Sequence, residues 1–137
     1  MANLKTLSGF PIQNLTSDPV PYAQALADNP YVGAWASGTN VNTARRSMAS
    51  AGTQTASIIT GGLLPPGTYA ITEQWNGSAW TEVADLNTGR WYFKASGTST
   101  ASLAYGGVES DPTASAKTEL WNGSGWTETG DLNTARQ

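Results

Sequence analysis

The chain has no cysteine and no histidine among its 137 residues. Without cysteine it has no disulfide framework and no thiolate metal site. Without histidine it lacks the commonest general base and the commonest metal ligand. The carboxylates that remain form no recognisable catalytic or metal-binding pattern. The sequence therefore predicts a protein that is not an enzyme and that holds neither a cofactor nor a metal.

Charge is also scarce. Only 12% of the residues are charged, and the net charge is −3 with no run of like charges. This composition argues against a nucleic-acid partner and against attraction to an anionic membrane. No segment approaches the roughly 20 apolar residues of a membrane span, and residues 1–10 lack the apolar centre of a secretory signal. We expect a protein that is made in the cytoplasm and does not insert into a membrane.

The abundant residues are small ones, above all Gly, Ser, Thr and Ala, and they are accompanied by six tryptophans. Side chains of this size cannot fill a wide core. They suit thin β-sheets that pack closely on one another, with tryptophan providing most of the large apolar area.

Residues 1–30 differ from the rest of the chain, because they match no later segment and carry repeated prolines. Proline excludes long helices and central strands. We predict an extended N-terminal anchoring arm over residues 1–30, with short strands at residues 4–7 and 11–15 and a single helical turn at residues 23–27.

From residue 31 onward the sequence repeats itself. Residues 42–45 (Asn-Thr-Ala-Arg) recur as residues 87–90 and 133–136, at spacings of 45 and 46 residues. A fixed period of this length indicates a repeat architecture, in which each period is one structural unit. The predicted units span about residues 43–85 and about residues 88–131.

Each unit contains the motif Trp-Asn-Gly-Ser, at residues 75–78 and again at residues 121–124. Asn-Gly between apolar residues is the strongest short-range signal of a β-hairpin, because both central residues of a type I′ turn need φ > 0. The predicted hairpins pair residues 72–75 with 79–83 and residues 119–121 with 125–128.

Two further strands precede each hairpin, and the second of them ends at a Gly-Gly pair. These strands are predicted at residues 45–50 and 56–60 in the first unit, and at residues 90–96 and 101–105 in the second. Residues 63–69 and 108–116 are predicted as loops. Four antiparallel strands in each period are typical of a β-propeller blade. A parallel solenoid is the structural alternative, and the Asn-Gly hairpins argue against it.

These units resemble Kelch repeats, in which a Gly-Gly pair closes the second strand, an acidic residue and an aromatic residue follow, and an Arg opens the next unit. The residues that carry the resemblance are Gly61, Gly62, Gly106, Gly107, Trp75, Trp80, Trp121, Trp126, Arg45 and Arg90. Both units have Trp where the family usually has Tyr in the third strand. The resemblance implies Kelch-type β-propeller blades over residues 31–137, with an extra strand at Trp35 from a neighbouring blade. We expect Trp80 and Trp126 to be core residues of equal weight.

The units contain Ala-Gly-Thr-Gln-Thr-Ala at residues 51–56, Trp-Asn-Gly-Ser, and Asp-Leu-Asn-Thr-Ala-Arg at residues 131–136, and in these motifs they are similar to Kelch-like proteins of tailed bacteriophages. Residues 4–9, followed by residues 13–15 and 17–19, resemble the start of phage fibre proteins. The resemblance implies a virion structural protein, such as a component of a tail fibre or a similar appendage, made in the host cytoplasm. Residues 1–30 would then bind other virion proteins, and the blades would contact a partner or the host surface and its glycans. The alternative is a bacterial propeller that binds glycans or proteins without catalytic activity.

Two blades cannot close a propeller, which needs four or more. Either identical chains complete the ring, as in a trimer, or the chain is the front part of a longer one. Trp35 lies at the position of a fourth strand with no preceding three, which favours the longer parent. In both cases we expect that the isolated chain does not form a stable monomer.

Arg45 and Arg90 recur in register, and so do Glu73 and Glu119. A catalytic residue is needed once per site, whereas a structural residue recurs in every unit. We therefore predict a structural role, with each Arg paired with a carboxylate or with backbone carbonyls between blades.

Trp91, Tyr92 and Phe93 break the repeat, because they replace Arg, Ser and Met of the first unit. Strand alternation predicts that at least one of the three rings packs in the core. The alternative is a surface that stacks on a sugar or contacts a partner, with Glu109 and Asp111 of the longer loop beside it. Solvated loop charge is the other interpretation of these two acidic residues.

Overall fold

The computed structural model describes residues 6–7, 10–11, 36–109 and 113–137. The chain divides into two compact regions, an N-terminal region (residues 1–37) and a C-terminal region (residues 38–137). The regular elements of the described residues are all β-strands. In this part of the chain no helix is long and apolar enough to cross a membrane.

The N-terminal region contains a pair of short strands. These are β1 (Thr6–Leu7) and β2 (Phe10–Pro11), which pair antiparallel. They overlap the two stretches that the sequence predicts as strands of the arm. The predicted helical turn at residues 23–27 and the predicted strand at Trp35 lie outside the described residues.

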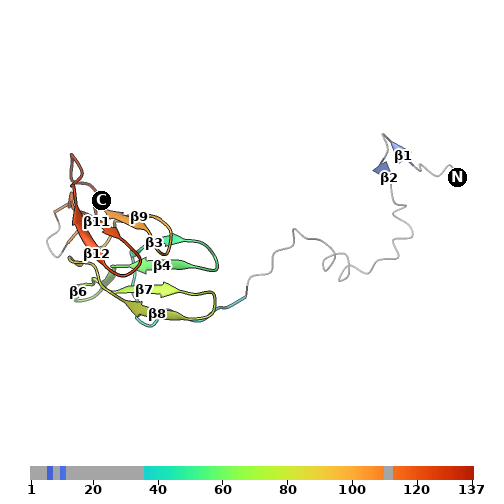
Figure 1. Cartoon of the computed structure of the whole chain (residues 1–137), viewed down its shortest axis with the longest axis horizontal. Coiled ribbons are helices and arrows are strands. Elements are labelled where there is room, and N and C mark those ends of the chain that lie inside the picture. The colour runs from blue at the N-terminus through green and yellow to red at the C-terminus, as the bar shows by residue number, and fades with distance from the viewer. Residues whose placement is uncertain (1–5, 8–9, 12–35, 110–112) are drawn as a thin grey trace. The chain divides into compact units, whose positions relative to one another are not determined.

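The C-terminal region begins with an antiparallel sheet of four strands, called the first sheet (Figure 1). Its strands, in spatial order, are β3 (Ala49–Gly52), β4 (Ser57–Thr60), β7 (Thr72–Trp75) and β8 (Trp80–Val83). A small hairpin is inserted between β4 and β7, in a segment that the sequence predicts as a loop. This hairpin consists of β5 (Leu63–Leu64) and β6 (Gly67–Thr68).

The second sheet repeats this plan. Its strands are β9 (Lys94–Gly97), β10 (Ser102–Tyr105), β11 (Thr118–Trp121) and β12 (Trp126–Thr129), which are neighbours in that order. All pairings within both sheets are antiparallel. The structure therefore confirms the prediction of an all-β fold with four antiparallel strands in each unit.

Both predicted hairpins are confirmed, but their turns are not the tight type I′ turns that the Asn-Gly signal is based on. The last paired residues before the turn are tryptophans, so residues 76–79 form the loop instead of two residues. The Oδ1 atom of Asn76 accepts hydrogen bonds from the backbone N–H groups two and three residues further along, each at 2.9 Å. Gly77 has a positive φ of 96°, whereas Asn76 does not have a positive φ. The Asn76 side chain thus holds a wider loop by bonding to its own backbone, and Asn122 does the same in the second hairpin.

The first strand of each sheet begins later than predicted, at Ala49 and at Lys94. Ser47 and Tyr92 have φ values of 56° and 52°, which interrupt the extended backbone just before these strands. Residues with a side chain rarely adopt this conformation. The sequence carries no signal for it, because a positive φ is expected at Gly or Asn and not at Ser or Tyr.

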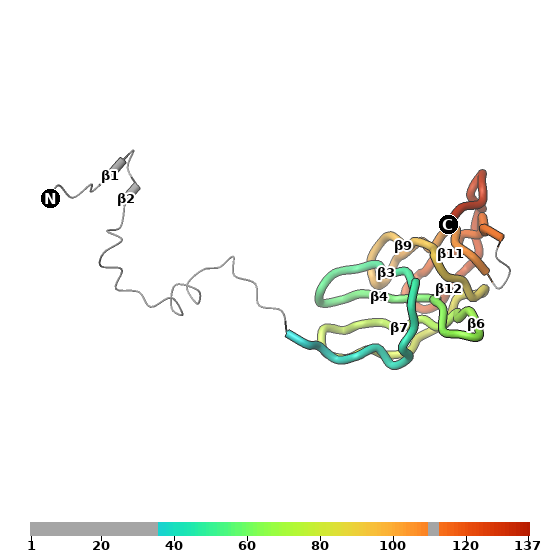
Figure 2. Tube along the Cα trace, turned by 180° about the vertical axis from the view of Figure 1, so that it is seen from behind, coloured from blue at the N-terminus to red at the C-terminus, as the bar shows by residue number. Residues whose placement is uncertain are grey.

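The core of the C-terminal region lies between the two sheets, where β3 and β9 run side by side (Figure 2). Its buried residues are Ala49, Ile58, Leu86, Phe93, Ala104, Trp121 and Trp126. Trp126 is 7% exposed, and its Nε1 donates to Thr72 Oγ1 of the first sheet at 3.1 Å. Trp80 has the same repeat position but is only half-buried, because it lies on the side of the first sheet that the second sheet does not cover.

The Gly-Gly pair lies where the first sheet meets the connector to the second. Gly61 has a φ of 62°, and a Cβ at this position would lie 2.6 Å from the carbonyl oxygen of Arg90 and 2.6 Å from a ring carbon of Phe93. The N–H of Gly62 donates to the same Arg90 carbonyl at 2.8 Å. A side chain has no room here, so close packing of the two repeat units requires glycine.

Candidate functional site

The charged groups that recur in the sequence form buried ion pairs. Arg45 lies in the connector before β3, and its NH1 atom is 2.5 Å from Glu73 Oε1 on β7, with both side chains fully buried. The Nε of Arg45 donates to the Gly61 carbonyl at 2.7 Å. The other carboxylate oxygen of Glu73 accepts the backbone N–H of Asn42 at 2.7 Å.

The second unit has the same arrangement. Arg90 lies in the connector between the sheets, and its NH2 atom bonds to Glu119 Oε1 on β11, with both side chains fully buried. Arg90 NH1 also donates to the Lys117 carbonyl at 2.9 Å. The backbone N–H and the Nδ2 of Asn87 donate to Glu119 Oε2 at 2.8 and 2.9 Å.

These two pairs fasten each connector to the sheet that follows it. Each arginine pairs with a carboxylate, as predicted, but each ion pair lies within one repeat unit and not between two units. The Arg90 backbone also bonds to Gly62 and Tyr69 of the preceding unit. A carboxylate that is buried and already bonded to a guanidinium and to amides cannot reach a substrate. Its geometry suits a structural role.

The pKa of Glu73 is set by this environment. Burial alone would raise the pKa of the Glu73 carboxyl, but the hydrogen bonds from Arg45 and from the Asn42 and Thr43 amides, together with the Arg45 charge, outweigh it. The net effect is a pKa below the ordinary value of 4.5. The ionised form of Glu73 therefore stabilises the fold.

Stability should depend on pH through this group. Because the folded pKa is depressed, the contribution of Glu73 is fully present above pH 4.5 and is lost as the pH falls below 4.5 through the folded value. Urea unfolding of the chain and of Glu73→Gln, measured from neutral pH to about pH 3, should show a smaller acid-dependent loss in the variant. Identical pH profiles for the two proteins would contradict this assignment.

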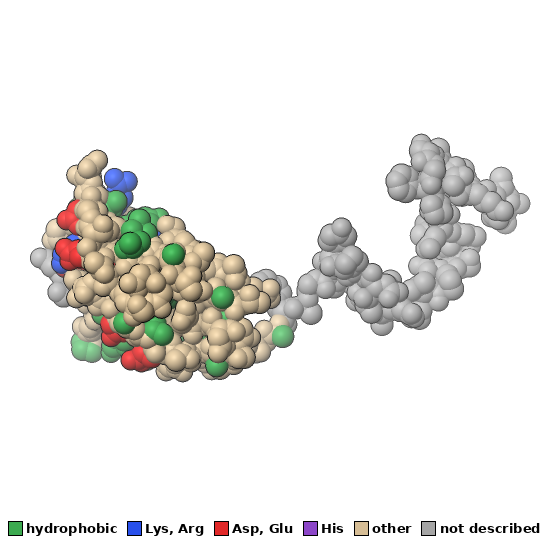
Figure 3. Space-filling view, in the orientation of Figure 1, with side chains coloured by type: hydrophobic (Ala, Val, Ile, Leu, Met, Phe, Trp, Pro, Cys, Tyr) green, Lys and Arg blue, Asp and Glu red, His purple; other side chains and the backbone are tan. Residues whose placement is uncertain are grey.

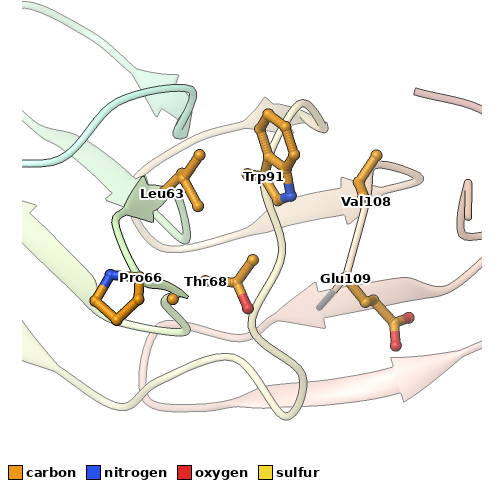
Figure 4. Close-up of a pocket in the computed structure, with 7 residues that line it drawn as sticks. Leu63, Pro66, Thr68, Trp91, Val108 and Glu109 are labelled. Carbon is orange, nitrogen blue, oxygen red and sulfur yellow. The ribbon is translucent and has the colours of Figure 1, made fainter. Parts of the chain in front are cut away.

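A pocket of about 390 Å³ lies between the β5–β6 hairpin and the connector into β9 (Figure 4). Its wall includes Leu63, Pro66, Thr68, Trp91, Val108 and Glu109. Trp91 is half-buried, and its indole N–H donates to no acceptor among the described residues. The pocket thus combines an aromatic ring with an unused donor, an apolar wall and the hydroxyl of Thr68.

The structure separates the aromatic cluster predicted from the sequence. The rings of Trp91 and Tyr92 are in contact, with centroids 4.2 Å apart, and Tyr92 is 54% exposed. Phe93 is 3% exposed and packs in the core between the sheets. One ring of the three is therefore a core residue, and the other two lie at or beside the pocket.

Glu109, an acidic residue of the longer loop, lies in the wall of the pocket. It accepts hydrogen bonds from Ser115 Oγ at 2.9 Å and from Lys117 Nζ at 3.3 Å. Asp111 lies outside the described residues. Sequence reasoning missed the opposite wall of the pocket, because the β5–β6 hairpin with Leu63 and Thr68 was predicted as a loop.

The described charged side chains are few and scattered over the surface seen in Figure 3. The face of the C-terminal region seen in Figure 3 consists mostly of uncharged polar side chains and backbone, with a few acidic and basic groups. Across the described ranges no three acidic side chains are grouped so that they could hold a metal ion. The pocket beside Trp91 is therefore the best candidate for ligand contact in this part of the chain.

No protein-family model matches the chain, and no curated protein is significantly similar to it. Its function has to be inferred from the residues themselves and from the geometry of the two sheets.

Proposed function

We propose that the chain is a non-enzymatic structural protein of a tailed-phage virion, a component of a tail fibre or a similar appendage. In this proposal the two sheets are consecutive blades of a Kelch-type β-propeller. The observation that carries it is the repeated joint, because Arg90 fastens its connector to the second sheet as Arg45 fastens its own to the first. Each unit has the same internal joint, and the units contact each other through the bond from Trp126 to Thr72. Repeated units of this kind suit an extended or ring-shaped scaffold.

The sequence supports a division of labour between the two parts of the chain. Residues 1–30 attach the protein to other virion proteins, which the resemblance of residues 4–9 to phage fibre proteins supports. Residues 31–137 form the exposed module. The protein is made in the host cytoplasm and acts as part of the particle, without membrane insertion and without a nucleic-acid partner.

Location in the particle can be tested directly. Antibodies against residues 38–137 should label the tail or its appendages in immunogold electron micrographs of the phage that encodes the chain. Antibodies preadsorbed with the pure protein provide the control. Labelling of cell debris with none on particles would refute the virion role while leaving the fold unaffected.

The second candidate function is binding of a glycan by a bacterial propeller, and the pocket beside Trp91 favours it. A volume of about 390 Å³ lies in the range of small-ligand sites. Sugars present apolar C–H faces that stack on aromatic rings. Their hydroxyl groups can accept a hydrogen bond from the indole N–H of Trp91, which has no acceptor among the described residues. Thr68 and Glu109 supply acceptors at the same pocket.

Replacing Trp91 with alanine should therefore weaken glycan binding by about tenfold or more, which corresponds to about 1.4 kcal/mol. Isothermal titration of bacterial surface polysaccharides measures this effect. Trp80→Ala is the matched control, because Trp80 is also half-buried but does not line the pocket. Equal affinities for the Trp91→Ala variant and the parent would exclude the pocket as the glycan site.

A further inference from the structure

The face of the second sheet that points away from the first sheet, called the outer face, carries an unpaired hydroxyl and an exposed apolar side chain. Side chains alternate along β11, so Thr118 and Leu120 point away from the core that contains Trp121. Leu120 is 47% exposed. Thr118 is 4% exposed, and its buried Oγ1 has no hydrogen-bond partner among the described residues. An unpaired buried hydroxyl is costly.

The first sheet has the same positions, and there the next unit satisfies them. Thr72 corresponds to Thr118, and its Oγ1 accepts the indole N–H of Trp126 at 3.1 Å. Thr72 also bonds to the Thr60 hydroxyl at 2.7 Å within its own sheet. In the second sheet Tyr105 replaces Thr60 as the cross-strand partner. Thr129 lies opposite Thr118 on β12, but no described group bonds to the Thr118 hydroxyl. A donor from a following unit would satisfy Thr118 as Trp126 satisfies Thr72.

The connector that would lead to a following unit is already in place. The Gly107 N–H donates to the Arg136 carbonyl at 2.8 Å, as the Gly62 N–H donates to the Arg90 carbonyl at 2.8 Å. Arg136 Nε donates to the carbonyl two residues before it at 3.3 Å, and Arg90 Nε makes the equivalent bond at 3.4 Å. The Arg136 side chain is exposed, whereas Arg90 is fully buried. Among the described residues the Arg136 guanidinium has neither a carboxylate partner nor a bond like that from Arg90 NH1 to the Lys117 carbonyl.

We propose that the outer face is the docking surface for a third four-stranded unit of the same repeat. This unit supplies a Trp from its fourth strand, whose indole N–H bonds to Thr118 Oγ1. It also supplies a Glu from its third strand, which pairs with Arg136. Leu120 is covered in the same contact. The docking surface does not depend on the virion role, because it follows from the joint between the two sheets.

A second copy of this chain does not meet these requirements. Its first sheet would bring Glu73 towards Arg136, but Glu73 is already bonded to its own Arg45 and to the Asn42 amide. One of the two arginines would then be buried without a counterion, which is strongly unfavourable. The partner must therefore carry a Glu that no arginine of its own occupies.

The proposal can be tested by supplying such a unit. A copy of residues 92–137 is appended after Gln137, which keeps the spacing from Arg136 to the copied Glu119 equal to the spacing from Arg90 to Glu119. The added unit should be protected from hydrogen exchange, and the extended protein should melt as one cooperative unit. Arg136→Gln should lower the Tm of the extended protein by about 5 °C or more. The same change should leave the Tm of the original chain unaltered.

Thr118→Val gives a readout with opposite signs. In the original chain it removes an unpaired hydroxyl and should leave the Tm equal or higher, whereas in the extended chain it removes an acceptor and should lower the Tm. Thr72→Val is the matched control and should lower the Tm in both, because Trp126 loses its acceptor. An added unit without exchange protection, or equal effects of Thr118→Val in both proteins, would overturn the proposal. Self-association of the original chain that Thr118→Val abolishes would assign the face to a second copy instead.

Discussion

Replacement of Trp126 with alanine is expected to lower the free energy of unfolding by about 3–5 kcal/mol, the usual loss for a large aromatic residue in a core. Trp126 is 7% exposed and belongs to the cluster between the sheets. Its ring lies 5.3 Å from that of Trp121. The change also removes the donor to the buried hydroxyl of Thr72. Urea unfolding followed by circular dichroism measures the loss.

Trp80→Ala is the matched control for this prediction. Trp80 has the same repeat position and pairs with Trp75 as Trp126 pairs with Trp121. Because Trp80 is only half-buried, its removal should cost about 1–2 kcal/mol. The sequence alone predicts equal weight for the two residues. Equal losses in the two variants would mean that the second sheet does not cover the first as described.

Glu119→Gln is expected to destabilise the chain by about 3–5 kcal/mol, because it leaves the buried guanidinium of Arg90 without a counterion. Both side chains of this pair are fully buried. Glu109→Gln is the control, since Glu109 pairs with Lys117 at 3.3 Å and these side chains are 26% and 36% exposed. An exposed pair of this kind contributes about 0–1 kcal/mol. Chemical unfolding of the two variants should therefore differ by several-fold in the loss of stability.

A double replacement separates the charge from the contact. Arg90→Met combined with Glu119→Leu removes both buried charges and should recover much of the stability lost in Glu119→Gln. If the double variant is as unstable as the single one, the hydrogen bonds from the Arg90 guanidinium to backbone carbonyls contribute more to stability than the ion pair does. These bonds join the guanidinium to the carbonyl of Lys117 and would then explain the recurrence of the arginine.

The repeat and its hairpins could be predicted from the sequence because each depends on local signals. Asn-Gly at residues 76–77 marks a hairpin, and the recurring Arg and Glu mark positions with one structural role. The turn differs from the type I′ geometry behind this signal, because the Asn76 side chain bonds to the following backbone N–H groups and the Asn76 backbone does not adopt a positive φ. A side-chain bond of this kind competes with the tight turn, and the dipeptide alone does not reveal which arrangement forms.

Features that depend on tertiary packing could not be predicted. Ser47 and Tyr92 adopt a positive φ where each connector enters its sheet. The β5–β6 hairpin, which walls the candidate pocket, has only two residues in each strand and lacks a periodic pattern. The division of the aromatic cluster, with Phe93 in the core and Tyr92 exposed, depends on where the first sheet lies. A single unit read by itself contains none of this information.

The two sheets differ most clearly in their indole groups, and exchange of the indole N–H protons with solvent tests the stacked arrangement directly. The N–H of Trp126 is bonded to Thr72 in the covered joint, whereas the N–H of Trp80 has no acceptor in the described part of the chain. In an NMR experiment in deuterated water, the Trp126 signal should persist long after the Trp80 signal has disappeared. Rapid loss of both signals, or equal protection of both, would contradict the stacking of two repeat units with one covered face.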